Sequence, residues 1–310
     1  MDHPQAQQGK VDEHVFLIGR PPLGEFLAFI TTQAVGGNAI SQGMLAAEWR
    51  KANDHLRKLE IDEAGWADNP EIKAVPGAQE PLAKEVHADP MFQRSFQVVP
   101  TDIGIVQLDR LIVFQKSINL KYVQSLQAGL GRKPSEDDIF RFCLSVKHPH
   151  PPVRVVQTNL NSFTFISPSN DFRFVEPRLW GSTDFVNYVP YGPVTGVLGL
   201  VLGYGSNFVT ALQAENRLVL INGSHRAYAL REMGITQIPC LIQHISRREE
   251  LEVVISGEVS QKPDLFLKAA RPPLLKDYFD PELRKQVQVA GKDRMVKITF
   301  GVETTDIPAT

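Results

Sequence analysis

The sequence predicts an α+β fold in which helices pack on a mixed sheet. Three stretches carry this prediction. Residues 217–242 contain two apolar runs separated by a glycine turn and a short helix-like segment, which is typical of a strand, helix and strand. Residues 103–114 indicate another strand, and apolar side chains at three- and four-residue steps predict an amphipathic helix over 41–60. At 310 residues and 43% apolar, the chain can bury a large core.

The first part of the chain, residues 1–97, is predicted to be a helical cap followed by a linker. Residues 1–14 are polar, and we expect a mobile tail there. A proline at the opening turn and a glycine pair at the end predict a helix over 23–35. Residues 71–100 are rich in proline and lack apolar periodicity, so we expect an irregular linker.

Residues 98–255 are predicted to form the main domain. Asn119 is a suitable N-cap for one helix and Ser135 for a second. Residues 256–310 are expected to be a C-terminal extension packed on the same domain, and their chemistry cannot be assigned from the sequence.

The turn between the strands of 217–242 is the strongest candidate site. Asn222 and Gly223 end the first strand, since glycine tolerates backbone angles that other residues avoid. Ser224 is then the predicted N-cap of a helix, in whose first turn His225 and Arg226 oppose the helix dipole. The free N–H groups of a helix start attract anions, so these cations predict a phosphate or carboxylate site. In the alternative, Arg226 pairs with a local carboxylate and His225 is a surface residue.

Two segments resemble a known superfamily. The residues GSHR at 223–226, followed by AYALREMGITQIPCLI, resemble the phosphate-binding segment of the ParB/sulfiredoxin superfamily. Residues 106–131 resemble its opening strand, loop and first helix. The resemblance implies that fold, with an insertion at about 131–195 that compact members lack. It also implies a ligand, ATP or another nucleotide, possibly together with Mg²⁺.

The resemblance also implies roles for particular residues. In sulfiredoxins a His-Arg pair and polar residues of the first helix hold ATP phosphates, which matches His225, Arg226 and Ser125. Lys121 lies one residue before the position of the family's helix lysine, which Tyr122 occupies here. One residue turns a helical side chain by about 100°.

The sequence departs from the superfamily at two catalytic positions, and each departure argues against one of its known reactions. Ser224 replaces the catalytic cysteine of sulfiredoxins, and serine lacks a readily formed thiolate, so sulfinic acid reduction is not expected. Gln115 falls where the related free-serine kinases have a glutamate base, and an amide cannot accept a proton at neutral pH.

Weaker candidates lie in the insertion and beside it. The glycines of residues 203–207 would let backbone N–H groups approach an anion, with Asn207 at the end of that loop. Arg173 could reach a ligand, or it could pair with Asp171 or Glu176. His148 and His150 could share a metal, but no third ligand is marked, so we predict no metal site.

The composition excludes several classes of protein. A net charge of −2, a pI near 6.5 and no helix-turn-helix pattern argue against a nucleic-acid partner. No apolar stretch is long enough to span a membrane. Two cysteines outside any CxxC pair fit a reducing cytoplasm. The sequence leaves open whether the protein forms a homo-oligomer.

Two functions remain. The first is a nucleotide-dependent phosphotransferase or hydrolase that acts on a small molecule, with the insertion forming the substrate wall. The second is a non-catalytic nucleotide-binding module for regulation or assembly. An acidic side chain within hydrogen-bond reach of the turn at 223–226 would favour the first, because a base must touch the proton that it removes.

Overall fold

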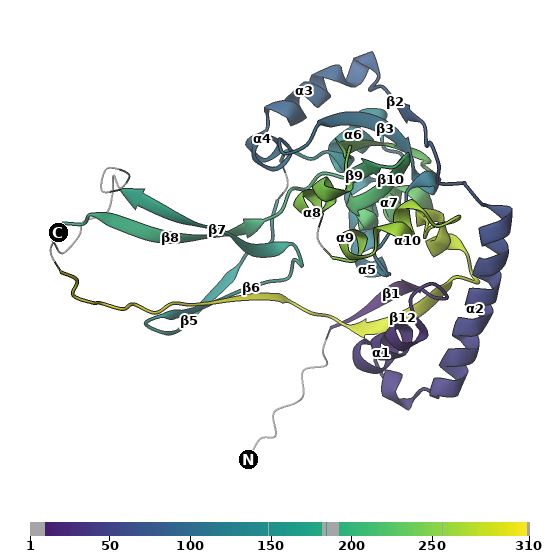
Figure 1. The fold of residues 1–310 in the computed structure, drawn as a ribbon, viewed down its shortest axis with the longest axis horizontal. Helices are drawn as coiled ribbons and strands as arrows, with labels where there is room; N and C mark the ends of the chain where they lie inside the picture. The colour runs from purple at the N-terminus through teal and green to yellow at the C-terminus, as the bar shows by residue number, and fades with distance from the viewer. Residues whose placement is uncertain (1–9, 148, 182–183, 185–191, 256, 309–310) are drawn as a thin grey trace. The chain divides into compact units, whose positions relative to one another are not determined.

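The computed structural model describes most of the chain, namely residues 10–147, 149–181, 184, 192–255 and 257–308. These residues form four sheets, mixed or antiparallel, and a set of helices, so the predicted α+β class is confirmed (Figure 1). No helix in the described ranges is both long enough and apolar enough to cross a membrane.

The chain divides into two compact units. Residues 10–147 and 206–291 form the first, and residues 149–205 and 292–308 form the second. The boundaries expected at residues 97 and 255 do not coincide with this division. The reason is that one three-stranded sheet of the first unit takes a strand from each of the three regions that the sequence suggested.

The first unit contains a five-stranded sheet in the order β10-β9-β11-β3-β2. The neighbours β9 and β11 are parallel and the other pairs antiparallel, which makes the sheet mixed. Its members are β2 (Ile72–Lys73), β3 (Thr101–Gln107), β9 (Thr210–Ala214), β10 (Arg217–Asn222) and β11 (Gln237–His244). Both strands predicted within 217–242 are confirmed. The strand predicted over 103–114 ends early, because the chain turns at Leu108 into a short 3-10 helix.

Three helices of the first unit surround the predicted site. They are α5 (Leu120–Leu130), α6 (Glu136–Cys143) and α7 (Ser224–Glu232). The predicted caps of the first two are confirmed. The side chain of Asn119 accepts the N–H of Tyr122 at 3.0 Å, and Ser135 forms a reciprocal capping box with Asp138.

A second sheet of this unit, in the order β12-β1-β4, corrects the last part of the mobile tail predicted over 1–14, from Val11 onward; residues 1–9 of that prediction lie outside the described residues. Its strands are β1 (Val11–Leu17), β4 (Ser117–Asn119) and β12 (Arg284–Ala290). β1 begins at Val11 and pairs antiparallel with both neighbours. The strand is stabilised by partners more than 100 and 260 positions away in the sequence, which no local pattern reveals.

The predicted helices over 23–35 and 41–60 are confirmed as α1 (Leu23–Gln33) and α2 (Gln42–Asp62). The prediction of an irregular linker over 71–100 is wrong in part, since it contains α3 (Glu80–Ala88) and α4 (Pro90–Ser95). Two of the prolines that suggested a linker, Pro81 and Pro90, stand in the first turns of these two helices, where no N–H is required. Three short helices follow β11: α8 (Leu251–Val254), α9 (Glu258–Gln261) and α10 (Pro263–Leu267).

The second unit consists of two antiparallel sheets. One has the order β13-β6-β5, and the other is a two-stranded ribbon of β7 and β8. The strands are β5 (Arg154–Asn159), β6 (Ser162–Ser167), β7 (Phe172–Gly181), β8 (Gly196–Tyr204) and β13 (Arg294–Thr299). Strands predicted near residues 162–166 and 197–202 are confirmed as β6 and β8.

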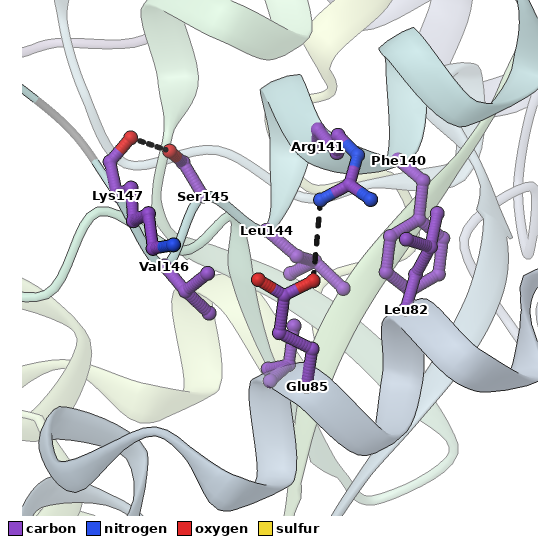
Figure 2. Close-up of a pocket in the computed structure, with 9 residues that line it drawn as sticks. Leu82, Glu85, Phe140, Arg141, Leu144, Ser145, Val146 and Lys147 are labelled. Carbon is purple, nitrogen blue, oxygen red and sulfur yellow. Dashed lines mark hydrogen bonds and ion pairs between the residues drawn. The ribbon is translucent and has the colours of Figure 1, made fainter.

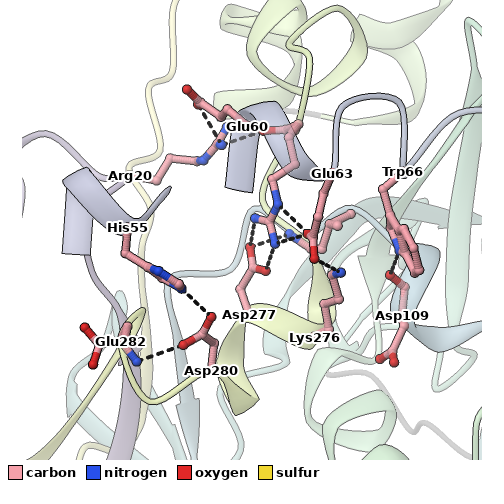
Figure 3. A network of polar contacts seen from close by, with 12 residues as sticks. Arg20, His55, Glu60, Glu63, Trp66, Asp109, Lys276, Asp277, Asp280 and Glu282 are labelled. Atoms are coloured by element: carbon pink, nitrogen blue, oxygen red, sulfur yellow. Dashed lines mark hydrogen bonds and ion pairs between the residues drawn. The ribbon is translucent and has the colours of Figure 1, made fainter. Parts of the chain in front are cut away.

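A buried ion-pair network joins the end of α2 to the segment after α10 (Figure 3). Arg271 is 1% exposed and Asp277 4% exposed. The two form a bidentate pair at 2.5 and 2.7 Å, and Arg271 also bonds Glu63 at 3.0 Å. Lys276 donates to the other oxygen of Glu63 at 2.7 Å. The segment whose chemistry the sequence left unassigned is therefore a structural connection within the first unit.

We predict that Arg271→Met lowers the free energy of unfolding by about 3–5 kcal/mol, because it leaves the buried Asp277 carboxylate without its cation. Urea unfolding followed by circular dichroism measures the change. The exposed Arg57→Met on α2 is the matched control and should stay within about 0.5 kcal/mol of the original protein. Equal losses for the two variants would contradict the assignment.

Candidate functional site

The predicted turn forms the start of α7. Gly223 is the N-cap, with φ of 90°, and a Cβ added to it would lie 2.8 Å from Cγ2 of Val209. The residue must therefore be glycine for both conformational and steric reasons. The prediction that Ser224 is the N-cap is wrong, since Ser224 is the first helical residue. No side chain of the described residues caps this helix, so its first N–H groups keep their capacity for an anion.

The side chain of Asn222 fixes the strand end next to this turn. Its Nδ2 donates to the carbonyl oxygens of Ser206 and Phe208, both at 2.9 Å. Asn222 therefore holds the residues before β9 against the end of β10, rather than pointing to a ligand.

Arg226 lies beneath the turn and is 6% exposed. Its Nη1 donates to the carbonyl oxygens of Asn207 at 2.5 Å, Cys143 at 2.9 Å and Phe142 at 3.3 Å. These carbonyls belong to the end of α6 and to the segment before β9. Arg226 thus joins the start of α7 to two other segments of backbone, which neither alternative for this residue anticipated. Asn207 therefore contacts the turn through its main-chain carbonyl, which accepts from Arg226.

His225 is a neutral acceptor in this structure. The backbone N–H of Asn119 donates to its Nε2 at 3.0 Å, which places the ring hydrogen on Nδ1. Burial, together with electrostatic repulsion from His14 and Arg226, lowers the pKa of His225 to about 4. The ring meets Tyr122 edge-on, with centroids 5.3 Å apart. The imidazole therefore offers an N–H donor without a positive charge at neutral pH.

Two residues of β1 extend the site, and sequence reasoning missed both. Asp12 is 8% exposed, and its Oδ2 accepts from Nδ2 of Asn119 at 3.2 Å. Although burial opposes the shift, bonds from Asn119 and Lys121 lower the pKa of Asp12 below its ordinary value. Nδ1 of His14 is buried and has no hydrogen-bond partner among the described residues. The signal was the two-residue spacing of Asp12 and His14, which puts them on one face of a strand.

Helix α5 supplies the other predicted residues near the turn. Nζ of Lys121 lies 3.3 Å from Oδ1 of Asp12, so this lysine is paired within the site. Ser125 is exposed, and its hydroxyl donates to the carbonyl of Tyr122 at 2.7 Å. Gln127, two residues further on, connects α5 to α7 through the carbonyl of Ala229 at 3.2 Å.

Two predicted residues have other partners. Nε2 of Gln115 donates to the carbonyl of Ser117 at 3.1 Å, and no hydrogen bond joins it to the turn among the described residues. Arg173 lies on β7 of the second unit and forms an ion pair with Asp171 at 3.3 Å. The sequence had suggested either this kind of internal ion pair or a contact with a ligand.

The possible metal ligands named from the sequence can be examined in part. No group of three or more His, Cys, Asp or Glu side chains suited to a metal ion occurs among the described residues. Of the histidine pair noted in the sequence, His148 lies outside those residues. The ring of His150 stacks on Tyr204 with centroids 4.0 Å apart.

Comparisons with known proteins add no family to this picture. Searches of the chain against protein-family models, characterised proteins and solved structures give no significant match. The interpretation of the site therefore depends on its geometry and on the resemblance of its motifs.

We predict that the free energy of unfolding falls as pH is lowered from about 6.5 to about 4. In this window the unfolded chain binds a proton at His225 that the folded protein excludes, so acid favours unfolding. His225→Gln should reduce this fall, because glutamine cannot be protonated there. Urea unfolding between about pH 7 and about pH 4.5 measures it. His14, whose pKa burial also lowers, is present in both proteins.

An identical pH dependence for the original protein and His225→Gln would contradict the neutral, buried state of His225. A His87→Gln control, at an exposed position of α3, should leave the dependence unchanged.

Proposed function

We propose that this protein binds a nucleotide, ATP or a similar one, with its phosphates at the N-terminus of α7. The observation that carries the proposal is the uncapped helix start at Gly223, with the neutral His225 fixed beside it. The resemblance of residues 223–226 and 106–131 to the ParB/sulfiredoxin superfamily supports it. We also propose that the mixed sheet of the first unit has the fold of that superfamily.

In this proposal the main-chain N–H groups of the first turn of α7, the hydroxyl of Ser224 and Nδ1–H of His225 donate to phosphate oxygens. Lys121 and Ser125 on α5 contribute from the neighbouring helix. Arg226 positions the turn through the carbonyls that it binds and adds positive charge beneath the phosphates. A Mg²⁺ ion, if it is bound, enters with the nucleotide.

Turnover is the second candidate, as a phosphotransferase or hydrolase that acts on a small molecule. Asp12 favours it, since this ionised carboxylate is connected to the turn through Asn119, which bonds both Asp12 and His225. The alternative without turnover is a regulatory or assembly module, for which a cytoplasmic homo-oligomer is a suitable setting. Cysteine chemistry is not proposed: Cys143 and Cys240 are buried, and burial raises the pKa of the Cys143 thiol to about 12.

We predict that Ser224→Asp abolishes nucleotide binding while it raises stability by about 0.3–1 kcal/mol. The new carboxylate occupies the helix N-terminus and repels phosphate, yet it interacts favourably with the helix dipole. Thermal unfolding with ATP, ADP or inorganic phosphate, each with and without Mg²⁺, measures both effects, because a bound ligand stabilises the folded state by mass action.

Ser224→Ala is the matched control and should keep most of the ligand-induced stabilisation, since the backbone N–H groups remain. Two results would sink the proposal: no stabilisation of the original protein at millimolar ligand, or equal stabilisation of Ser224→Asp.

For turnover, we predict that Asp12→Asn removes phosphate release from ATP while binding persists, because the amide oxygen can still accept the hydrogen bond from Asn119 but the amide cannot accept a proton. Release of phosphate and ADP with candidate small-molecule acceptors is the measurement. Absence of release from the original protein, with binding intact, would favour the non-catalytic module.

A further inference from the structure

A separate cavity of about 210 Å³ lies between α3, α6 and the residues that follow α6 (Figure 2). Four apolar side chains form its inner wall: Leu82, Val86, Phe140 and Leu144. Each of them is 9% exposed or less, so the wall belongs to the core of the first unit. The cavity is smaller than the usual site of a drug-sized ligand, which limits an occupant to one small ring or branched chain.

The rim of this cavity carries more positive than negative charge. Arg141 and Glu85 form an ion pair at 3.2 Å that crosses one side, where Figure 2 shows their side chains facing each other. Lys147 lines the cavity as well, and its ammonium group forms no ion pair among the described residues. Arginine keeps further N–H donors after one contact with Glu85. A ligand with one negative charge would therefore meet two cations and a single carboxylate.

The geometry points to a binding site for a small monocarboxylate with a compact apolar body. The apolar part fills the space against Phe140 and Leu144, and the carboxylate binds Lys147 and the remaining donors of Arg141. A neutral molecule of the same shape lacks the interaction with Lys147 and Arg141. This site is independent of nucleotide binding at α7 and uses none of the residues assigned there.

Benzoate is the probe that tests this inference. Methyl signals of Leu82, Val86 and Leu144, followed by ¹³C NMR in the full-length protein, should shift and saturate at millimolar benzoate. Benzamide, the neutral isostere, should bind several-fold more weakly. Lys147→Met should weaken benzoate binding by about three- to tenfold, given its exposed position. Lys84→Met, an exposed lysine of α3 that does not line the cavity, is the matched control and should leave binding unchanged.

Val146→Trp places a large side chain on the half-buried rim and should abolish the saturable methyl shifts. Its melting temperature, measured without ligand, shows whether the variant is folded. Three results would overturn the inference: no saturable shift in the original protein, equal affinity for benzoate and benzamide, or unchanged binding in a folded Val146→Trp protein.

Discussion

The hydrogen bonds of Arg226 are the constraint on which the site depends. A buried guanidinium must satisfy its N–H groups, and here one nitrogen donates to carbonyls from the end of α6 and from the segment before β9. These bonds fix the backbone around Gly223 and so hold the first turn of α7 in place. The sequence suggested Arg226 as a ligand-binding residue, but its first role is structural. By holding the first turn of α7 in place, it keeps the N–H groups of that turn in position to bind an anion.

Three remote segments assemble the rest of the site. β1 brings Asp12 and His14, the junction of β4 and α5 brings Asn119, and α7 brings His225. Asn119 is the centre of this arrangement, because it caps α5, bonds Asp12 and donates its N–H to the imidazole. That last bond selects one tautomer of a histidine that burial keeps neutral. The outcome is a donor-rich, weakly charged surface at a helix N-terminus, with one ionised carboxylate nearby.

Local sequence patterns predicted part of this fold and site. The apolar runs and the glycine of 217–242 predicted β10, α7 and β11, and the side chains of Asn119 and Ser135 predicted the starts of α5 and α6. The role of the first half of β1 could not be predicted, since its residues up to His14 look like a polar tail until β12 and β4 pair with them. Prolines concealed α3 and α4, because a proline in a first turn and a proline in a linker look alike locally. The carbonyl contacts of Arg226 also depend on tertiary placement.

The central claim is that phosphate binds the first N–H groups of α7. Titration of the ¹⁵N-labelled protein with ATP and Mg²⁺, followed through backbone amide signals, tests it most directly. We expect the amides of Ser224 and His225 to show the largest shifts, to saturate together, and to move downfield as hydrogen bonds to phosphate form. Saturable shifts confined to other parts of the chain, or no saturable shift at these two amides, would contradict it.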